Sequence, residues 1–196
     1  AVVGENGAFY FRYDRTTRKM IRRYIDDDAT RALHREQLRA IANEILKAVP
    51  GCAIAADQPY RETDLAIDFC EDVKPLSREA VEKIATLMCA RGLTAKISSI
   101  HVNGWFGAYD KLGMTRTLMR EAFNVDLDAE RGHYVFAGDS PNDEPMFGFF
   151  PHAVGVANVN DFAALITRFP AYITQARCGA GIAELAQALL STEQKT

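Results

Sequence analysis

Hydrophobic positions along the chain divide it into two regions with different periodicity. In the first region, apolar residues at helical spacing predict one helix over residues 34–49 and another that begins at Ser77. Pro50 and Gly51 end the first helix, and Ser77 is a favourable N-cap for the second. Four short runs predict strands, at residues 52–56, 65–69, 94–98 and 100–102. This order predicts helices layered on an antiparallel sheet.

The pattern changes after Gly104. Residues 134–137 form a continuous apolar run, which is typical of a strand buried on both faces of a parallel sheet. Further strands are predicted at 153–156 and 171–173, between helices at 111–124, 141 onward, 161–166 and 182–190. Strands that alternate with helices predict a doubly wound sheet and hence an α/β fold class.

The two patterns suggest three segments. Residues 1–13, with a strand at 1–3 and extended chain at 9–13, would form one core segment. Residues 14–103, which show only weak periodicity up to residue 33, would form an inserted α+β domain. Residues 104–196 would form the rest of an α/β core.

Composition narrows the classes of partner. Hydrophobic residues make up 48% of the chain and charged residues 25%, which is ordinary for a globular protein. The net charge of -3 gives no reason to expect nucleic acid or an anionic membrane as a partner. No apolar run approaches the ~20 residues of a membrane helix. The four cysteines form no C-x-x-C pair, so we expect buried free thiols in the reducing cytoplasm.

The segment Gly138-Asp139-Ser140-Pro141-Asn142-Asp143 carries the clearest chemistry. It follows a predicted parallel strand, and sites in such sheets form at the carboxyl ends of strands. Two carboxylates and an amide offer hard oxygen ligands of the kind that Mg²⁺ prefers. The structural alternative is that Asp139 is a turn residue and Asp143 a capping acid.

Lys111 begins the helix that precedes this strand. A basic residue at a helix N-terminus opposes the helix dipole, so a lysine there is better explained if it faces an anion. The alternative is an ordinary solvated lysine.

These features together resemble a known family. The order of Lys111, the 138–143 loop and the 153–158 segment resembles the C-terminal half of the haloacid dehalogenase-like (HAD) phosphatases. Within them it is similar to the subgroup with a type IIB cap, which includes the sucrose-phosphate and mannosyl-3-phosphoglycerate phosphatases. Residues 5–8 resemble the segment where that subgroup enters its cap, residues 61–69 a cap strand, and residues 179–182 the turn before the last helix.

The resemblance implies a role for each matching residue. Asp139 and Asp143 would hold Mg²⁺, and Asn142 and Ser140 would surround the metal or the substrate phosphate. Lys111 would neutralise the phosphoryl oxygens, which suits a reaction that depends mainly on positioning and charge neutralisation. In the cap, the candidates for contacting a phosphorylated sugar or sugar-glycerate are Arg61, Glu62, His101 and Asn103.

The family's nucleophile has no counterpart in the sequence. In the family an aspartate-x-aspartate motif precedes the segment that corresponds to residues 5–7, and residues 26–28 and 126–128 are better explained as solvated loop acids. We therefore expect a fragment in which the strand at 1–3 has no neighbour to pair with and the strand at 134–137 loses its inner partner. A homodimer or swapped assembly is one way to cover such an edge.

Three functions remain open from the sequence. The first is a Mg²⁺-dependent phosphatase, competent in a full-length protein. The second is a phosphotransferase or mutase of the same fold. The third is a noncatalytic protein that binds a metal or ligand.

Overall fold

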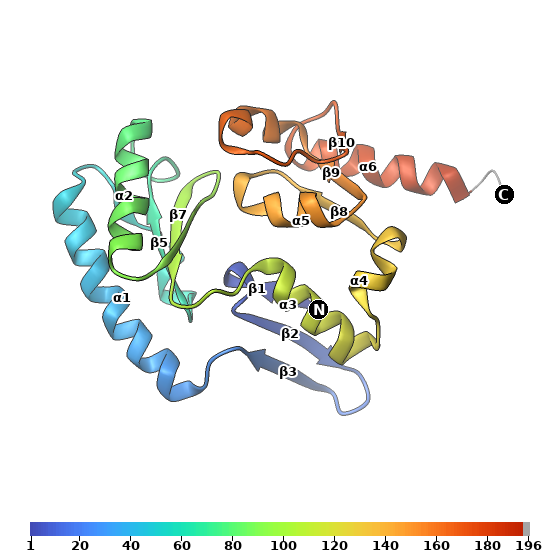
Figure 1. The fold of residues 1–196 in the computed structure, drawn as a ribbon, viewed down its shortest axis with the longest axis horizontal. Coiled ribbons are helices and arrows are strands. Elements are labelled where there is room, and N and C mark those ends of the chain that lie inside the picture. The colour runs from blue at the N-terminus through green and yellow to red at the C-terminus, as the bar shows by residue number, and fades with distance from the viewer. Residues whose placement is uncertain (194–196) are drawn as a thin grey trace. The chain divides into compact units, whose positions relative to one another are not determined.

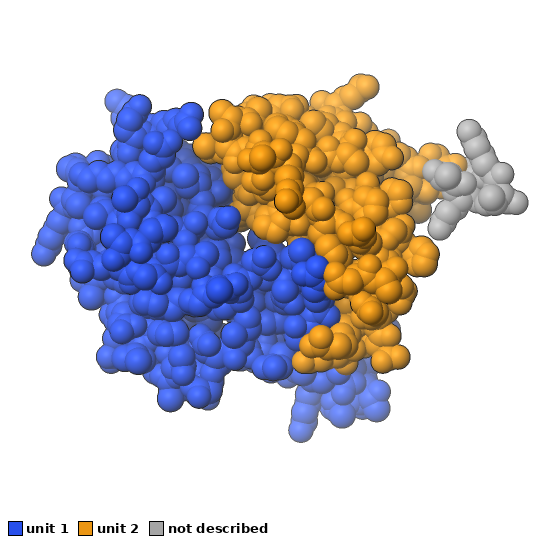
Figure 2. Space-filling view, viewed as in Figure 1, with its two compact units in different colours: residues 1–118 blue, residues 119–196 orange. Residues whose placement is uncertain are grey.

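The computed structural model describes residues 1–193 and divides into two compact units, 1–118 and 119–196 (Figure 2). Helix α3 (Lys111–Phe123) contains the boundary between them. This division differs from the segments inferred above, whose boundaries stay a prediction. No helix in the described part of the chain is long and apolar enough to cross a membrane.

The first sheet of unit 1 is a three-stranded antiparallel meander (Figure 1). It contains β1 (Val2–Gly4), β2 (Phe9–Asp14) and β3 (Lys19–Tyr24), with Val3 opposite Tyr10. The expectation that the first strand lacks a neighbour is therefore wrong. Strand β3 escaped sequence reasoning because its side chains are exposed or only half-buried, and so its polarity does not alternate clearly.

The second sheet of unit 1 is antiparallel, in the order β4-β5-β7-β6. Its strands are β4 (Ala53–Ile54), β5 (Asp64–Asp68), β6 (Thr94–Ile97) and β7 (His101–Trp105), and the 3-10 turn η2 (Gln58–Tyr60) lies between β4 and β5. Helices α1 (Asp28–Ala48) and α2 (Arg78–Ala90) pack on the apolar side of the sheet. The predicted layer of helices on an antiparallel sheet is present.

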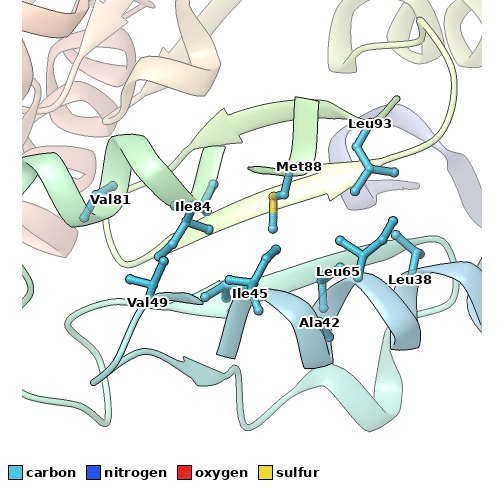
Figure 3. Close-up of a cluster of buried hydrophobic side chains, with 12 residues drawn as sticks. Leu38, Ala42, Ile45, Val49, Leu65, Val81, Ile84, Met88 and Leu93 are labelled. Atoms are coloured by element: carbon cyan, nitrogen blue, oxygen red, sulfur yellow. The ribbon is translucent and has the colours of Figure 1, made fainter. Parts of the chain in front are cut away.

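Successive side chains of β5 and β7 point to opposite sides of this sheet, so its two faces differ in polarity. Leu65, Ile67 and Val102 join the core with α1 and α2, and Figure 3 shows Leu65 beside Leu38 and Ala42 of α1. The alternate positions carry buried polar side chains and a tryptophan, namely Asp64, Asp68, His101, Asn103 and Trp105. Helix α1 begins earlier than predicted because the Asp27 carboxylate accepts the Thr30 N–H at 2.8 Å and caps it.

Unit 2 contains a parallel sheet in the order β10-β9-β8. Its strands are β8 (Val135–Gly138), β9 (His152–Gly155) and β10 (Tyr172–Ile173). Between and after them lie α4 (Leu127–Glu130), η3 (Arg131–His133), η4 (Pro141–Asp143), α5 (Glu144–Phe149), η5 (Ala157–Leu165) and α6 (Cys178–Glu193). The α/β fold class is confirmed.

Two details of unit 2 correct the sequence interpretation. Strand β8 is not buried on both faces: Val135 is 43% exposed and the other three residues are half-buried. It is also an edge strand, which pairs only with β9 among residues 1–193. The cysteines are free, as expected, but not buried. Cys52 and Cys70 are half-buried, and Cys89 and Cys178 are exposed.

Candidate functional site

The carboxyl ends of the three parallel strands of unit 2 meet at one edge of the sheet. The loops that follow them border a hollow of about 390 Å³. Its lining includes Asp139, Asp143, Asn158 and Cys178. This is the position where open parallel sheets form ligand sites. The structure therefore brings Asp139 and Asp143 together, as the sequence predicts.

Hydrogen bonds within the loop orient its acids. The Asp139 N–H donates to Asp143 Oδ2 at 3.1 Å, and the Asp143 N–H donates to the Ser140 carbonyl at 3.0 Å. Ser140 Oγ lies 2.5 Å from Asn142 Oδ1 and 3.4 Å from Asp143 Oδ2. Ser140 occupies the N-cap position of η4, but its hydroxyl does not bind the backbone of that helix. The hydroxyl instead donates to the polar side chains of the loop.

Gly138 permits the close approach of Asp143 to the end of β8. A Cβ at position 138 would lie 2.8 Å from Asp143 Oδ2 and 2.9 Å from its Cβ. Contacts that short are repulsive, so any larger residue would push the carboxylate away. The glycine at this position therefore follows from the position of Asp143.

Asn158 was missed as a candidate residue. It lies in the loop after β9, and its Oδ1 accepts the Cys178 N–H at 2.9 Å. Thr174 similarly links the loops, since its Oγ1 accepts the Ala157 N–H at 3.1 Å and donates to the Ala176 carbonyl at 2.8 Å. An asparagine that directly follows a buried strand was the available signal, because such residues lie at the same edge as Asp139.

The hollow offers mainly oxygen donors, of the kind that Mg²⁺ prefers, beside the Cys178 thiol. Of the residues that line it, Asp139 and Asp143 offer carboxylate oxygens and Asn158 an amide oxygen, which are hard ligands. No group of three or more His, Cys, Asp or Glu side chains that could hold a metal occurs in the described part of the chain. A site with two carboxylates suits Mg²⁺, which usually keeps several waters.

Lys111 belongs to unit 1, where it is the first residue of α3. The Asp110 carboxylate accepts the Gly113 N–H at 2.7 Å, which satisfies one donor of the first turn. Gly7 lies directly beside this helix start, since a Cβ there would be 2.0 Å from the Asp110 carbonyl oxygen and 2.9 Å from Lys111 N. The Glu5–Gly7 turn therefore contacts the start of α3, while the role of Lys111 stays a prediction.

Two of the four cap candidates lie together in unit 1. Arg61 Nη1 lies 3.0 Å from Asp64 Oδ1 and 3.5 Å from Asn103 Oδ1. Arg61 Nε and Nη2 bind the Asp57 carboxylate at 2.9 Å and 2.8 Å. Most donors of this guanidinium are thus used within the fold.

The other two candidates have separate partners. Glu62 accepts the Tyr24 hydroxyl at 2.9 Å, and His101 Nε2 lies 2.8 Å from Glu71 Oε2. His101 shares the polar face of the sheet with Asn103, at the opposite end of the face from Trp105. The structure therefore joins Arg61 with Asn103, while Glu62 and His101 bind other residues.

The Glu5 side chain fixes the loop that carries Arg61 and Glu62. Its carboxylate accepts the N–H groups of Glu62, Thr63 and Asp64 at 2.8, 2.6 and 3.2 Å. The next residue, Asn6, donates from Nδ2 to Asp64 Oδ2 at 3.3 Å. Glu5 and Asn6 both have positive φ, 43° and 55°, so this turn keeps a backbone conformation that L-residues rarely adopt.

Burial shifts the ionisation of this cluster. Desolvation, with a contribution from the Glu5 carboxylate, raises the pKa of Asp64 to about 6, although Arg61 opposes the shift. Desolvation lowers the pKa of Arg61, but its bonds to Asp57 and Asp64 more than compensate and raise it overall. Burial also raises the pKa of Tyr109, whose ring stacks on Trp105 with 6.0 Å between centroids.

The two acidic segments with nucleophile-like spacing serve as helix caps. Asp27 caps α1, as described above. The Asp126 carboxylate accepts the Asp128 N–H at 3.1 Å and the Ala129 N–H at 3.4 Å at the start of α4. Both segments therefore have a local structural role.

Sequence comparisons alone find no relative: no family model and no curated protein matches the chain. Solved structures do match. A Thermoplasma acidophilum protein, designated 0175, superposes with a TM-score of 0.59 at 19% identity, over 94% of this chain and 70% of that one. A trehalose-6-phosphate phosphatase related protein gives a TM-score of 0.51 at 15% identity, over 97% and 72% of the two chains.

The chain has a HAD-like fold. The resemblance inferred from the loop and Lys111 is thereby confirmed at the level of the fold. The sucrose-phosphatase of Synechocystis, solved with sucrose and phosphate, matches with a TM-score of 0.49 at 16% identity, over 76% of this chain and 61% of that one. The chain thus spans less than two thirds of that enzyme.

Proposed function

We propose that this chain carries the metal-binding part of a Mg²⁺-dependent phosphatase that hydrolyses phosphomonoesters. The observation that supports this most strongly is the pair of carboxylates, Asp139 and Asp143, at the carboxyl edge of the parallel sheet in a HAD-like fold. The proposal concerns a protein in which an aspartate nucleophile accompanies this chain.

Each residue of the loop has a defined part in this proposal. Asp139 and Asp143 would hold Mg²⁺, whose charge, when bound, stabilises the negative phosphoryl oxygens. Asn142 and Ser140, already hydrogen-bonded to each other, would orient waters or phosphate oxygens at the rim. The ammonium of Lys111 would add a second positive charge, because phosphoryl transfer depends mainly on positioning and charge neutralisation.

A phosphorylated sugar or sugar-glycerate is the proposed substrate class, in the cytoplasm. The supporting observation is the polar face of the β4-β5-β7-β6 sheet. Asn103 and His101 lie on it, and buried Trp105 Nε1 has no hydrogen-bond partner among residues 1–193. Amide, imidazole and indole groups on one surface suit a ligand with many hydroxyls.

The direct test compares two proteins in a p-nitrophenyl phosphate assay with Mg²⁺. One is the 196-residue chain, and the other is the chain extended N-terminally by an aspartate-bearing strand. We expect turnover, abolished by EDTA, from the extended protein only. Metal binding without turnover in the extended protein would instead favour a noncatalytic binding protein.

The role of Asp139 is tested separately from turnover. Asp139→Ala in the extended protein should abolish Mg²⁺-dependent hydrolysis, and in the 196-residue chain it should abolish the Mg²⁺ binding seen by calorimetry. Asp128→Asn, which alters an exposed acid of α4, is the matched control and should leave both measurements unchanged. Unchanged metal binding in Asp139→Ala would remove this residue from the site.

A further inference from the structure

A hollow of about 650 Å³ lies within unit 1, between α1 and the segment from β4 through η2 to β5. Its volume falls within the range of about 300–1,000 Å³ typical of small-molecule sites. Its floor is apolar. Figure 3 shows three of the floor residues, Leu38, Ala42 and Leu65, beside one another, and Ile54, Ala55 and Pro59 complete the apolar lining.

A row of polar side chains on α1 borders this floor. Arg35, Arg39 and Asn43 follow at intervals of four residues, which places them on one side of the helix. Neither Arg35 nor Arg39 has a hydrogen-bond or ion-pair partner in the part of the chain that the structure describes, although like charges one turn apart repel each other. Arg78, the first residue of α2, and Arg91, which follows its last residue, each pair with a glutamate. The rim therefore holds two uncompensated positive charges.

The opposite wall is held in place by its own bonds. Gln58 Nε2 donates to the Asp64 carbonyl at 2.8 Å, and Gln58 Oε1 accepts the Ala66 N–H at 2.8 Å. Arg61 is fixed between Asp57 and Asp64, and the Asp64 side chain is fully buried. The wall is thus formed before any ligand arrives, which lowers the entropic cost of binding.

We propose that this hollow binds a small organic phosphate. The dianionic phosphoryl group would lie against Arg35 and Arg39, because two uncompensated guanidinium charges balance two negative charges and form charge-assisted hydrogen bonds with its oxygens. The organic part would lie on the apolar floor around Leu38 and Ala42. The site involves neither Asp139 nor Lys111, so it stands independently of the proposed phosphatase activity.

The test titrates phenylphosphonate, which a phosphatase cannot hydrolyse, into the 196-residue chain in the absence of metal. We expect calorimetry to show binding that Arg35→Gln/Arg39→Gln weakens at least about tenfold, through the loss of charge-assisted bonds. The matched control, Arg78→Gln/Arg91→Gln, removes the same charge from the two ends of α2 and should change the affinity by less than about twofold. Inorganic phosphate should bind at least about tenfold more weakly than phenylphosphonate, because it buries no apolar surface.

A second variant guards against a loss of fold. Asn43→Glu adds an exposed negative charge to the same row and should also weaken binding, while circular dichroism reports an unchanged fold. The proposal is wrong if Arg35→Gln/Arg39→Gln binds phenylphosphonate as tightly as the parent. It is equally wrong if the α2 control loses as much affinity, since net charge rather than a site would then explain the binding.

Discussion

Asp143 Oδ2 accepts the backbone N–H of Asp139 at 3.1 Å, so the second acid of the loop orients the first. Asp143 is buried, with 6% of its surface exposed, and the end of β8 lies against it. An acid in this position binds the backbone as well as facing the hollow. Changes that move Asp143 should therefore alter the candidate metal site and the stability of unit 2 together.

Gly138→Ala is the sharpest test of that coupling. The added Cβ would lie 2.8–2.9 Å from three atoms of Asp143, so we expect a loss of about 1–3 kcal/mol in the free energy of unfolding and weaker Mg²⁺ binding. Gly132→Ala is the control, since no atom lies within 4 Å of a Cβ there. Urea unfolding and calorimetry give both quantities. Equal stabilities of the two variants would show that the loop tolerates the methyl group.

Glu5→Gln should loosen the loop that carries Arg61 and Glu62. The carboxylate accepts three backbone N–H groups, whereas an amide has only one acceptor oxygen, so we expect a loss of about 1–3 kcal/mol. Hydrogen exchange should show faster exchange at the amides of residues 62–64. Glu36→Gln, an exposed change on α1, is the control and should leave both measurements unaltered. Parent-like exchange in Glu5→Gln would mean that these bonds do not hold the loop.

Gly7→Ala separates steric contact from backbone conformation. Gly7 and Gly92 both have positive φ, 101° and 81°, but only at Gly7 would a Cβ meet other atoms, with the Asp110 carbonyl oxygen 2.0 Å away. Gly92→Ala should cost about 1 kcal/mol through its φ alone. Gly7→Ala should cost clearly more and should disturb the start of α3, as thermal unfolding and the amide signals of residues 110–113 would report. A similar cost in the two variants would contradict the close contact.

The spacing of apolar residues predicted the helices and strands that pack against a formed hydrophobic core. Leu38, Ile41 and Ile45 of α1 repeat at helical spacing because one side of that helix faces a formed core. The side chains of strand β3 are exposed or only half-buried, so its arginines and lysine gave no alternating pattern from which to predict it. Strand β8 showed the converse error, because its apolar run predicted two buried faces while Val135 remains 43% exposed.

The candidate site was predictable where its residues are close in sequence. Asp139 and Asp143 share one loop, so strand and turn signals located both. Asn158 comes from a different loop, and only the parallel pairing of β8 with β9 brings it to the same hollow. The partners of Arg61 were likewise unpredictable, because contact between Asn103 and Arg61 depends on the strand register of the sheet.

The buried Asp64 carboxyl should make stability depend on pH with a definite sign. Its pKa is raised from 3.8 to about 6, so the folded protein holds this proton more tightly than the unfolded chain does. The stabilising contribution is fully present below the unfolded pKa and is lost as the pH rises through about 6. Asn at this position cannot titrate. From about pH 4 to pH 7 the free energy of unfolding of the parent should therefore fall relative to Asp64→Asn, by up to about 3 kcal/mol.

Asp57→Asn provides the control, since Asp57 binds the same guanidinium of Arg61 but titrates in the opposite sense. The hydrogen bonds from Arg61 lower the pKa of Asp57, so its contribution is present above the unfolded pKa and is lost as the pH falls. Parent and Asp57→Asn should hence differ by a constant amount between about pH 5 and pH 7 and converge in acid. Urea unfolding across this range measures both differences. A parent–Asp64→Asn difference that stays constant from about pH 4 to pH 7 would show that Asp64 is ionised in the folded protein throughout, with the charge of Arg61 outweighing burial.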